Sequence, residues 1–247
     1  MANTRELRRR IRSVKNTAQI TKAMQMVAAT KMRKAQNQAI NGRPYSFNLS
    51  SALERLLPLV DIESHPLLSG NGSDARGVIL LSTDKSLCGA LNTNLFRMLT
   101  SSGLISGNSV FYTVGKKGRN FVAKSGKNLL ADFPNLDTVT FREAVQLAKL
   151  AMDSFKAGEV GEVYLIFPHF ISTLRQEPIK VKLLPVDLES VILNASEGSL
   201  ANARTSNELR DSSLVTQNDK KGTQAEFLFE PDPDKLLDFI LVHYIRM

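Results

Sequence analysis

The sequence has one cysteine, no tryptophan and no long apolar run, and these absences narrow the class of protein. Cys88 is the single cysteine in 247 residues, so no disulfide can form within the chain, which is typical of a reducing compartment. No apolar stretch reaches the roughly 18 residues that span a bilayer, and the first residues lack the apolar core of a secretory signal. We therefore expect membrane contact only through partners.

Signals of catalysis, metal binding and nucleotide binding are also missing. His65, His169 and His243 lie far apart in the sequence and follow no metal-ligand spacing. The glycine-rich dinucleotide and P-loop patterns do not occur, and "VGKKGRN" at 114–120 has the wrong spacing for a P-loop. Cys88 precedes a glycine in a predicted turn, but no base pattern marks it as a nucleophile. We expect no catalytic, cofactor-binding or metal-binding residue, no cofactor, and a non-enzymatic role.

Acidic and aromatic residues are scarce at the start of the chain. Residues 1–34 hold ten Lys or Arg against the single acid Glu6, a formal charge of +9, and the total of +8 leaves −1 for the rest. No aromatic residue precedes Tyr45. Nucleic-acid-binding domains usually interleave aromatic side chains with basic ones for base stacking. The pattern favours a basic helix that meets an acidic protein, with a nucleic-acid-binding helical arm as the alternative.

The same segment carries apolar residues with a period of 3.5. Alternating steps of four and three residues from Leu7 meet eight apolar residues in ten positions, over about five heptads. These positions are Leu7, Ile11, Val14, Ala18, Thr21, Gln25, Ala28, Met32, Ala35 and Ala39, and we call them the seam. The spacing predicts a coiled-coil helix of roughly 40 residues and roughly 60 Å, first interrupted at Gly42 and Pro44. Asn3 is expected as its N-cap, with Glu6 placed to return the hydrogen bond.

A second apolar stripe, Ile20, Met24 and Val27, runs beside the seam. The middle of the helix is therefore apolar over a wider arc than one partner helix covers, which predicts that other polypeptides surround it. The many alanines allow close approach of backbones, and flexible methionines adapt to more than one surface. Mitochondrial transit peptides are also basic and amphipathic, but they are usually shorter than this pattern.

Short apolar runs alternate with helical patterns in the middle of the chain. Strands are predicted at 77–84, 109–115, 162–172 and 178–186, with a turn at 84–89 and helical patterns through 98 and over 141–155. This alternation implies an α/β fold with a partly parallel sheet covered by helices. Residues 187–224 are polar and rich in Ser and Asn, which predicts a long surface loop with a short hairpin at 190–194.

Three stretches resemble the gamma subunits of F-type ATP synthases. "NTRELRRRIRSVKNTAQITKAMQMVAATKMRKAQ" (3–36) resembles their N-terminal helix, and its core from Ile20 to Lys31 is the most distinctive part. "STDKSLCGALN" (82–92) resembles a turn of the family, and "FLFEPDPDKLLDFIL" (227–241) resembles the segment that leads into its C-terminal helix. With the pattern between them, the resemblance covers essentially the whole chain.

The resemblance implies an architecture and a set of partners. The N-terminal and C-terminal helices would form an antiparallel coiled coil, with a Rossmann-like α/β globular domain between them. The chain then divides into an N-terminal coiled-coil helix (1–57), an α/β globular domain (76–186), a polar loop (187–226) and the start of a C-terminal helix (227–247). The implied partners are the alpha, beta and epsilon subunits and the membrane c-ring, without nucleic acid, at the cytoplasmic face of a bacterial inner membrane.

The implied function is that of a rotor stalk. In this family proton flow turns the membrane ring, the ring turns the gamma subunit, and the asymmetric coiled coil changes the affinities of the catalytic sites in sequence, so the gamma subunit itself makes no bond. The residues expected to bind partners come from the helix and from the turn at 82–92. They are Leu7, Ile11, Val14, Ile20, Lys22, Met24, Val27, Lys31, Arg33, Asp84 and Lys85.

One departure from the family pattern concerns the C-terminal helix. In the family this helix is about as long as the N-terminal one, whereas some 14 residues follow Pro233 here, about 20 Å of helix. We therefore expect a truncated C-terminal helix that reaches only the later part of the first helix. Much of the seam would then need cover from the assembly.

Overall fold

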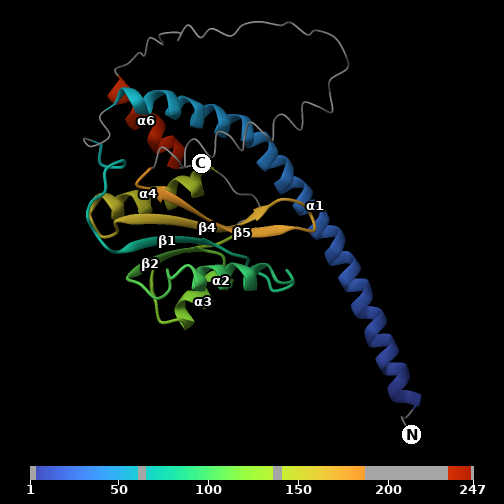
Figure 1. Cartoon of the computed structure of the whole chain (residues 1–247). Helices are drawn as coiled ribbons and strands as arrows, with labels where there is room; N and C mark the ends of the chain where they lie inside the picture. Colours follow the sequence, from blue (N-terminus) through green and yellow to red (C-terminus); the bar gives the residue numbers. More distant parts are fainter. Residues whose placement is uncertain (1–3, 61–64, 136–140, 187–232, 246–247) are drawn as a thin grey trace, which may run out of the picture. The chain divides into compact units, whose positions relative to one another are not determined.

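The structure is a computed structural model that describes residues 4–60, 65–135, 141–186 and 233–245. Its elements in chain order are α1 (Thr4–Leu56), the 3₁₀ turn η1 (Leu57–Leu59), β1 (Arg76–Leu81), α2 (Leu91–Ser101), β2 (Ser109–Val114), α3 (Lys116–Lys124), β3 (Asn128–Phe133), α4 (Phe141–Lys156), β4 (Glu162–Phe170), β5 (Gln176–Leu184) and α6 (Pro233–Ile245). Figure 1 shows these elements along the chain. The prediction of a long N-terminal helix and an α/β fold is confirmed.

Helix α1 is longer than the apolar period predicts. It runs for 53 residues and passes through both Gly42 and Pro44, where the sequence pattern places its first interruptions. Because Pro44 has no N–H, the carbonyl of Ile40 lacks its usual helical donor. Ile40 is exposed, so water can satisfy that carbonyl. Beyond Pro44 the helix is stabilised by tertiary packing, since Leu53 and Leu56 are fully buried. The predicted N-cap Asn3 lies outside the described residues.

The chain divides into two compact units, Met1–Pro44 and Tyr45–Met247. In the first unit every described side chain from Thr4 to Ala35 is exposed, so this part of α1 has no core of its own. The second unit holds the sheet and all the buried hydrophobic residues among those that the structure describes. The boundary falls at the proline whose missing N–H interrupts the hydrogen bonding of α1.

The second unit is built on a five-stranded sheet with the order β3-β2-β1-β4-β5. The first four strands of this order are parallel, and β5 runs antiparallel at the edge beside β4. Parallel neighbours need crossover connections, which α2, α3 and α4 supply. After β3 the chain crosses back and adds β4 on the other side of β1. The carboxyl ends of β1 and β4 therefore lie at the point where ligand sites of doubly wound folds usually form.

Alternate residues of the strands supply two cores, one on each face of the sheet. Val78, Leu80 and Phe111 pack with residues of α2 and α3 in one cluster. Ile79 and Tyr112 pack with α4 and with the ends of α1 and α6 in the other. The three layers follow from the two-residue period of the strands, because successive side chains point to opposite faces. Figure 1 shows α4 and the α2–α3 pair on opposite sides of the strands.

Two elements were missed by the sequence analysis. Helix α3 occupies the stretch that was considered only as a P-loop candidate, and β3 lies in a stretch for which no strand was predicted. Both are short, and Gly118 within α3 weakens the helical pattern. The predicted loop and hairpin in residues 187–226 lie outside the described residues.

Candidate assembly surfaces

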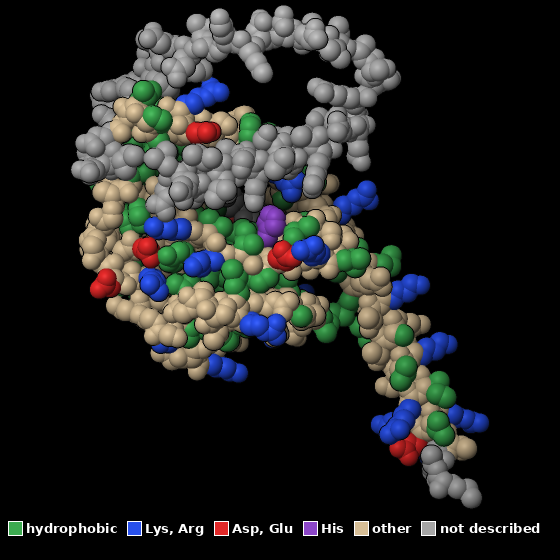
Figure 2. Space-filling model, viewed as in Figure 1, with side chains coloured by type: hydrophobic (Ala, Val, Ile, Leu, Met, Phe, Trp, Pro, Cys, Tyr) green, Lys and Arg blue, Asp and Glu red, His purple; other side chains and the backbone are tan. Residues whose placement is uncertain are grey.

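The exposed part of α1 presents the first candidate surface. The six predicted apolar contact residues, Leu7, Ile11, Val14, Ile20, Met24 and Val27, are all exposed, with Val14 at 69% and Met24 lowest at 47%. Side chains this apolar rarely form a continuous stripe in water unless another polypeptide covers them. Figure 2 shows hydrophobic and basic side chains side by side along this segment.

One polar position of the seam, Thr21, is compatible with an apolar interface. Thr21 donates its hydroxyl to the carbonyl of Thr17 at 2.9 Å, and beside the seam Thr30 bonds to the carbonyl of Met26 at 3.0 Å. Because the helix itself satisfies these hydroxyls, covering them would leave no unpaired donor. The seam therefore accepts a dry contact at Thr21 as well as at its alanines.

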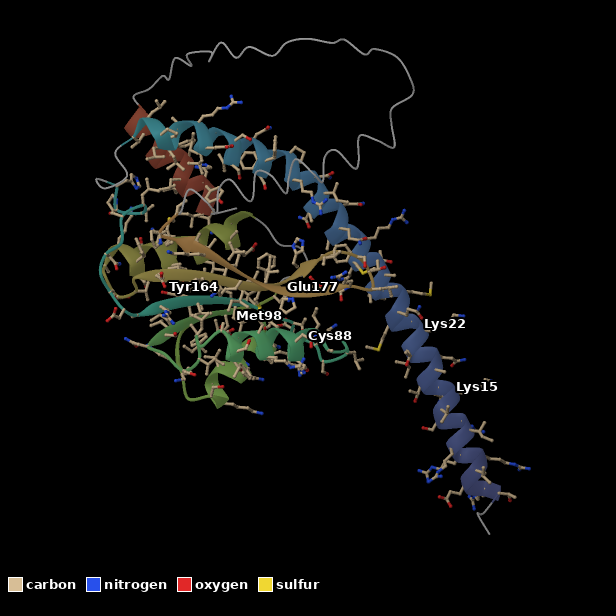
Figure 3. The ribbon with its side chains drawn as sticks, in the orientation of Figure 1. Lys15, Lys22, Cys88, Met98, Tyr164 and Glu177 are labelled. Carbon is tan, nitrogen blue, oxygen red and sulfur yellow. The ribbon has the colours of Figure 1, made fainter. Side chains whose placement is uncertain are left out.

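The predicted basic contact residues lie on the same helix. Lys22, Lys31 and Arg33 are exposed, and Figure 3 labels Lys22 and Lys15 along the segment. Their cationic heads stand beside the apolar stripe, so a partner that covers both would combine an apolar groove with acidic groups. Asp84 and Lys85 belong to the second unit, so the predicted residues form two sets that the structure describes separately.

The turn at 82–92 is fastened to α3. The backbone N–H groups of Lys116, Lys117 and Gly118 donate respectively to Asp84 Oδ1 at 2.8 Å, to the Thr83 carbonyl at 3.0 Å and to Ser82 Oγ at 2.7 Å. Asp84 therefore binds the start of α3, while α2, the helix that follows the turn, has no side-chain cap.

This fastening explains the glycines of "VGKKGRN". A Cβ at Gly115 would lie 2.4 Å from the Ser82 carbonyl oxygen, and a Cβ at Gly118 would lie 2.7 Å from Ser82 Oγ. The glycines allow β1 to approach the start of α3. The first three N–H groups of α3, which would face a phosphate in a nucleotide-binding turn, already bind residues 82–84.

A second set of contacts closes the same turn. Asn92 Nδ2 donates to Thr83 Oγ1 at 2.7 Å and to Cys88 Sγ at 3.2 Å, and Thr83 Oγ1 donates to the Lys85 carbonyl at 2.8 Å. Between these anchors the turn exposes Lys85 and Leu87, the latter at 84%. It is therefore a fixed projection with one cation and one apolar side chain at its surface. Figure 3 labels Cys88 within it.

A cavity of about 780 Å³ lies beside this turn, between the sheet and α4. Its walls are mainly apolar, with Leu81, Leu165 and Leu183 from three neighbouring strands. Asn135, one of its few polar residues, donates to the Ser82 carbonyl at 3.3 Å. Binding pockets usually have a few polar groups that converge on the ligand. The Asn135 amide of this cavity already donates to the Ser82 carbonyl.

Metal-binding clusters and membrane-spanning helices are absent from the part of the chain that the structure describes. Within residues 4–60, 65–135, 141–186 and 233–245, no group of three His, Cys, Asp or Glu side chains is placed to hold a metal ion. No helix in the described part of the chain is long and apolar enough to cross a membrane. The three histidines lie on separate segments, and His65 Nδ1 accepts the N–H of Leu67 at 3.2 Å.

The comparisons with known proteins match this chain over all or nearly all of its length. The family described as ATP synthase matches residues 3–247. The ATP synthase gamma chain of Opitutus terrae is 39% identical over 247 residues, covering 100% of this chain and 78% of the relative. That of Methylacidiphilum infernorum is 39% identical over 255 residues, with the same shares covered. The fold resembles a chain of the Tetrahymena thermophila mitochondrial ATP synthase central stalk and c-ring, with a TM-score of 0.61, 22% identity and coverage of 92% and 88%.

Proposed function

The chain belongs to the ATP synthase family, in which its curated relatives are gamma chains, and we propose that it acts as the central rotor stalk of an F-type ATP synthase. In this role it couples proton flow to ATP synthesis by rotating inside a catalytic head. The nucleic-acid-binding alternative has no support among these relatives. The observation that carries the proposal is a 53-residue helix whose apolar stripe is exposed along the first unit.

The helix suits a shaft for mechanical reasons. A continuous helix of this length spans roughly 80 Å, which is enough to reach through a head built of several subunits. Its exposed seam has small or flexible side chains at Ala28, Met32 and Ala35, so contact with the head would not favour one orientation strongly. A shaft must turn between orientations of nearly equal free energy, and such a surface meets this requirement.

The coiled coil belongs to this proposal. Helix α6 would lie antiparallel to the later part of α1, because Leu237, Leu241 and Ile245 join the same buried cluster as Leu53 and Leu56. Beyond that part the seam would meet other polypeptides of the complex. Catalysis would stay with those polypeptides, and the chain itself would carry torque without forming or breaking a bond.

The partners and the site roles are proposed together. The alpha and beta subunits would surround the seam and the second stripe, with acidic groups opposite Lys22, Lys31 and Arg33. Arginines near the start of α1 oppose the helix dipole by tenths of a kcal/mol each, and acidic groups would offset that cost. The turn that holds Asp84 and exposes Lys85 would contact a neighbouring subunit. The epsilon subunit and the c-ring complete the set, at the cytoplasmic face of a bacterial inner membrane.

Purification of the intact complex tests the function. The full chain carrying an affinity tag is expressed in its own host, and the purified material is analysed by native mass spectrometry. The expected result is one copy of the chain with alpha and beta subunits, retained at moderate salt. Recovery of the chain alone, or with nucleic acid whose affinity falls steeply with salt, would contradict the proposal.

A further inference from the structure

Residues 85–87 are an exposed part of the turn between β1 and α2, and they lie between two fastened ends. At one end Asp84 Oδ1 accepts the N–H of Lys116, the first residue of α3, at 2.8 Å. At the other end Cys88 lies against the side chain of Asn92, the second residue of α2. Figure 3 labels Cys88 at this end of the turn. The exposed residues therefore belong to a short span that is held on both sides.

Asn92 uses both atoms of its amide group to hold the turn. Its Nδ2 donates to Thr83 Oγ1 at 2.7 Å and to Cys88 Sγ at 3.2 Å, and its Oδ1 accepts the N–H of Thr83 at 3.4 Å. Both amide hydrogens therefore have acceptors in the turn. Asparagine is a weak helix former, and α2 has no side-chain cap. The contacts with the turn, and not the stability of α2, account for an asparagine at this position.

The contact between Asn92 and Thr83 extends to Lys85, the exposed cation of the turn. Thr83 Oγ1 accepts a hydrogen from Asn92 and donates its own hydrogen to the Lys85 carbonyl at 2.8 Å. A hydroxyl has a single hydrogen, so a donor on one side directs that hydrogen to an acceptor on the other. Consecutive hydrogen bonds of this kind strengthen one another. Asn92 therefore fixes the direction of the Thr83 hydroxyl and, through it, the backbone at Lys85.

We propose that Asn92 is a positioning residue of the rotor, which keeps the turn rigid so that Lys85 and Leu87 transmit force to the neighbouring subunit. This inference rests on the proposed rotor function. A contact on a compliant loop yields when it is pushed, whereas a contact on a fastened span passes the displacement to the sheet. Three backbone N–H groups of α3 fasten residues 82–84. The Asn92 amide supplies the side-chain fastening at Cys88.

The substitution N92D reverses the hydrogen bond to Thr83 at almost unchanged side-chain size. A carboxylate only accepts hydrogen bonds, so it would draw the Thr83 hydroxyl hydrogen away from the Lys85 carbonyl. It would also leave Cys88 without the amide donor. A negative charge in the first turn of a helix is favourable, so we expect α2 itself to remain folded.

The control N94D makes the same change two residues later in α2. Asn94 Oδ1 accepts from Arg97 Nη1 at 3.4 Å, which is a contact within the helix. The two variants therefore add the same charge to the same helix and differ in whether the side chain bonds the turn.

Hydrogen exchange of the purified chain tests whether Asn92 holds the turn. Loss of one hydrogen bond lowers the population of the closed turn by up to about tenfold. We therefore expect the backbone amides of residues 82–92 to exchange up to about tenfold faster in N92D, while the amides of β1 before residue 82 and of β4 keep their rates. N94D should exchange like the unsubstituted chain. Equal exchange of residues 82–92 in N92D and in the unsubstituted chain would overturn the inference.

ATP synthesis in reconstituted vesicles tests whether the rigid turn transmits force. An imposed proton gradient drives synthesis, and the rate is divided by the amount of assembled complex. We expect N92D and T83V to lower the rate per complex by up to about tenfold, in proportion to the loss of the closed turn. T83S keeps the hydroxyl and should restore the rate, and N94D should retain it.

The remaining outcomes separate the inference from a purely structural role and from the rotor function. An unchanged rate per complex in N92D, together with a lower unfolding free energy, would show that Asn92 serves only the fold. An equal loss in N94D would show that added charge causes the effect. Either result overturns the inference. Failure of the unsubstituted chain to assemble with alpha and beta subunits would instead overturn the rotor function, whereas the exchange result for the turn would stand.

Discussion

Two helical glycines show how differently one added methyl group acts in this chain. A Cβ at Gly118 would lie 2.7 Å from Ser82 Oγ and 3.2 Å from Leu80 Cδ2, whereas nothing lies within 4 Å of a Cβ at Gly42. We expect G118A to lower the free energy of unfolding by about 1–3 kcal/mol because it crowds a buried contact. We expect G42A to stabilise α1 by up to about 1 kcal/mol through helix propensity.

Urea unfolding followed by circular dichroism compares the two variants. The loss in G118A should appear in the transition of the second unit, and the gain in G42A should appear as added helical signal that persists to higher urea. Equal effects of the two substitutions would show that the fit between β1 and α3 is not tight, contrary to the distances around Ser82.

Glu162 makes the stability of the second unit sensitive to acid. Burial alone would raise the pKa of Glu162, but the Tyr164 hydroxyl at 2.8 Å and Lys182 Nζ at 3.4 Å lower it below its ordinary value of 4.5. Folding therefore favours the ionised carboxylate. Its contribution to stability is present above about pH 4.5 and is lost as the pH falls through the lower pKa of the folded state.

The E162Q variant isolates this contribution. The difference in unfolding free energy between the unsubstituted chain and E162Q should be largest near pH 7 and should shrink toward pH 3, because protonation removes what the substitution removes. Denaturant titrations at pH 7, 5, 4 and 3 measure this difference. A difference that stays constant over the whole range would mean that the carboxylate charge contributes nothing.

Individual site residues are predictable only in part. The sequence correctly places a turn at 84–89, and its resemblance to the gamma family singles out Asp84 and Lys85. That Asp84 binds the start of α3 depends on a contact across 32 positions, which no local pattern reports.

At the scale of elements, the second apolar stripe of α1 provides a test of whether the position of an added charge on the helix matters. We expect M24K to impair coupling between ATP hydrolysis and proton pumping, because it places a cation in an arc that the head should cover with apolar groups. The control Q19K adds the same charge about 140° around the helix from Met24, at a residue that is already polar and exposed. Its effect on coupling should be smaller.

Reconstituted vesicles measure this coupling as protons pumped per ATP hydrolysed. The rate of hydrolysis serves as the check that each variant assembles. An unchanged pumping ratio in M24K would refute the role given to Met24. A loss of equal size in Q19K would show that added positive charge, and not its position on the helix, causes the effect.

The strength of each local signal decides which elements the sequence predicts. β1, β2, β4, β5 and α4 begin and end within three residues of their predicted bounds because their apolar runs are continuous or clearly periodic. Helix α1 is longer than predicted, because the burial of Leu53 and Leu56 outweighs the unfavourable effect of Pro44 within the helix. The strand order could not be read from the sequence, because pairing between distant strands leaves no local trace.

At the scale of the whole molecule, charge and core are separated along the chain. The +9 of residues 1–34 lies in a unit none of whose described residues is buried, and the hydrophobic core that the structure describes lies in Tyr45–Met247. Cores stabilise a unit by themselves, whereas an exposed basic helix is stabilised by what binds it. We therefore expect removal of the first unit to affect the binding of partners more than the stability of the second unit.

A chain reduced to residues 45–247 tests this separation. No side chain from Thr4 to Pro44 is buried, so we expect the thermal midpoint of the remaining unit to shift by no more than about 2 °C, which corresponds to less than about 1 kcal/mol for a unit of this size. Calorimetry of both chains measures the midpoints. The shortened chain should also lose the alpha and beta subunits in the tagged purification, since it lacks the seam. A fall of about 10 °C would mean that the first unit supplies folding free energy to the second, and the helix would then serve the fold as well as the assembly.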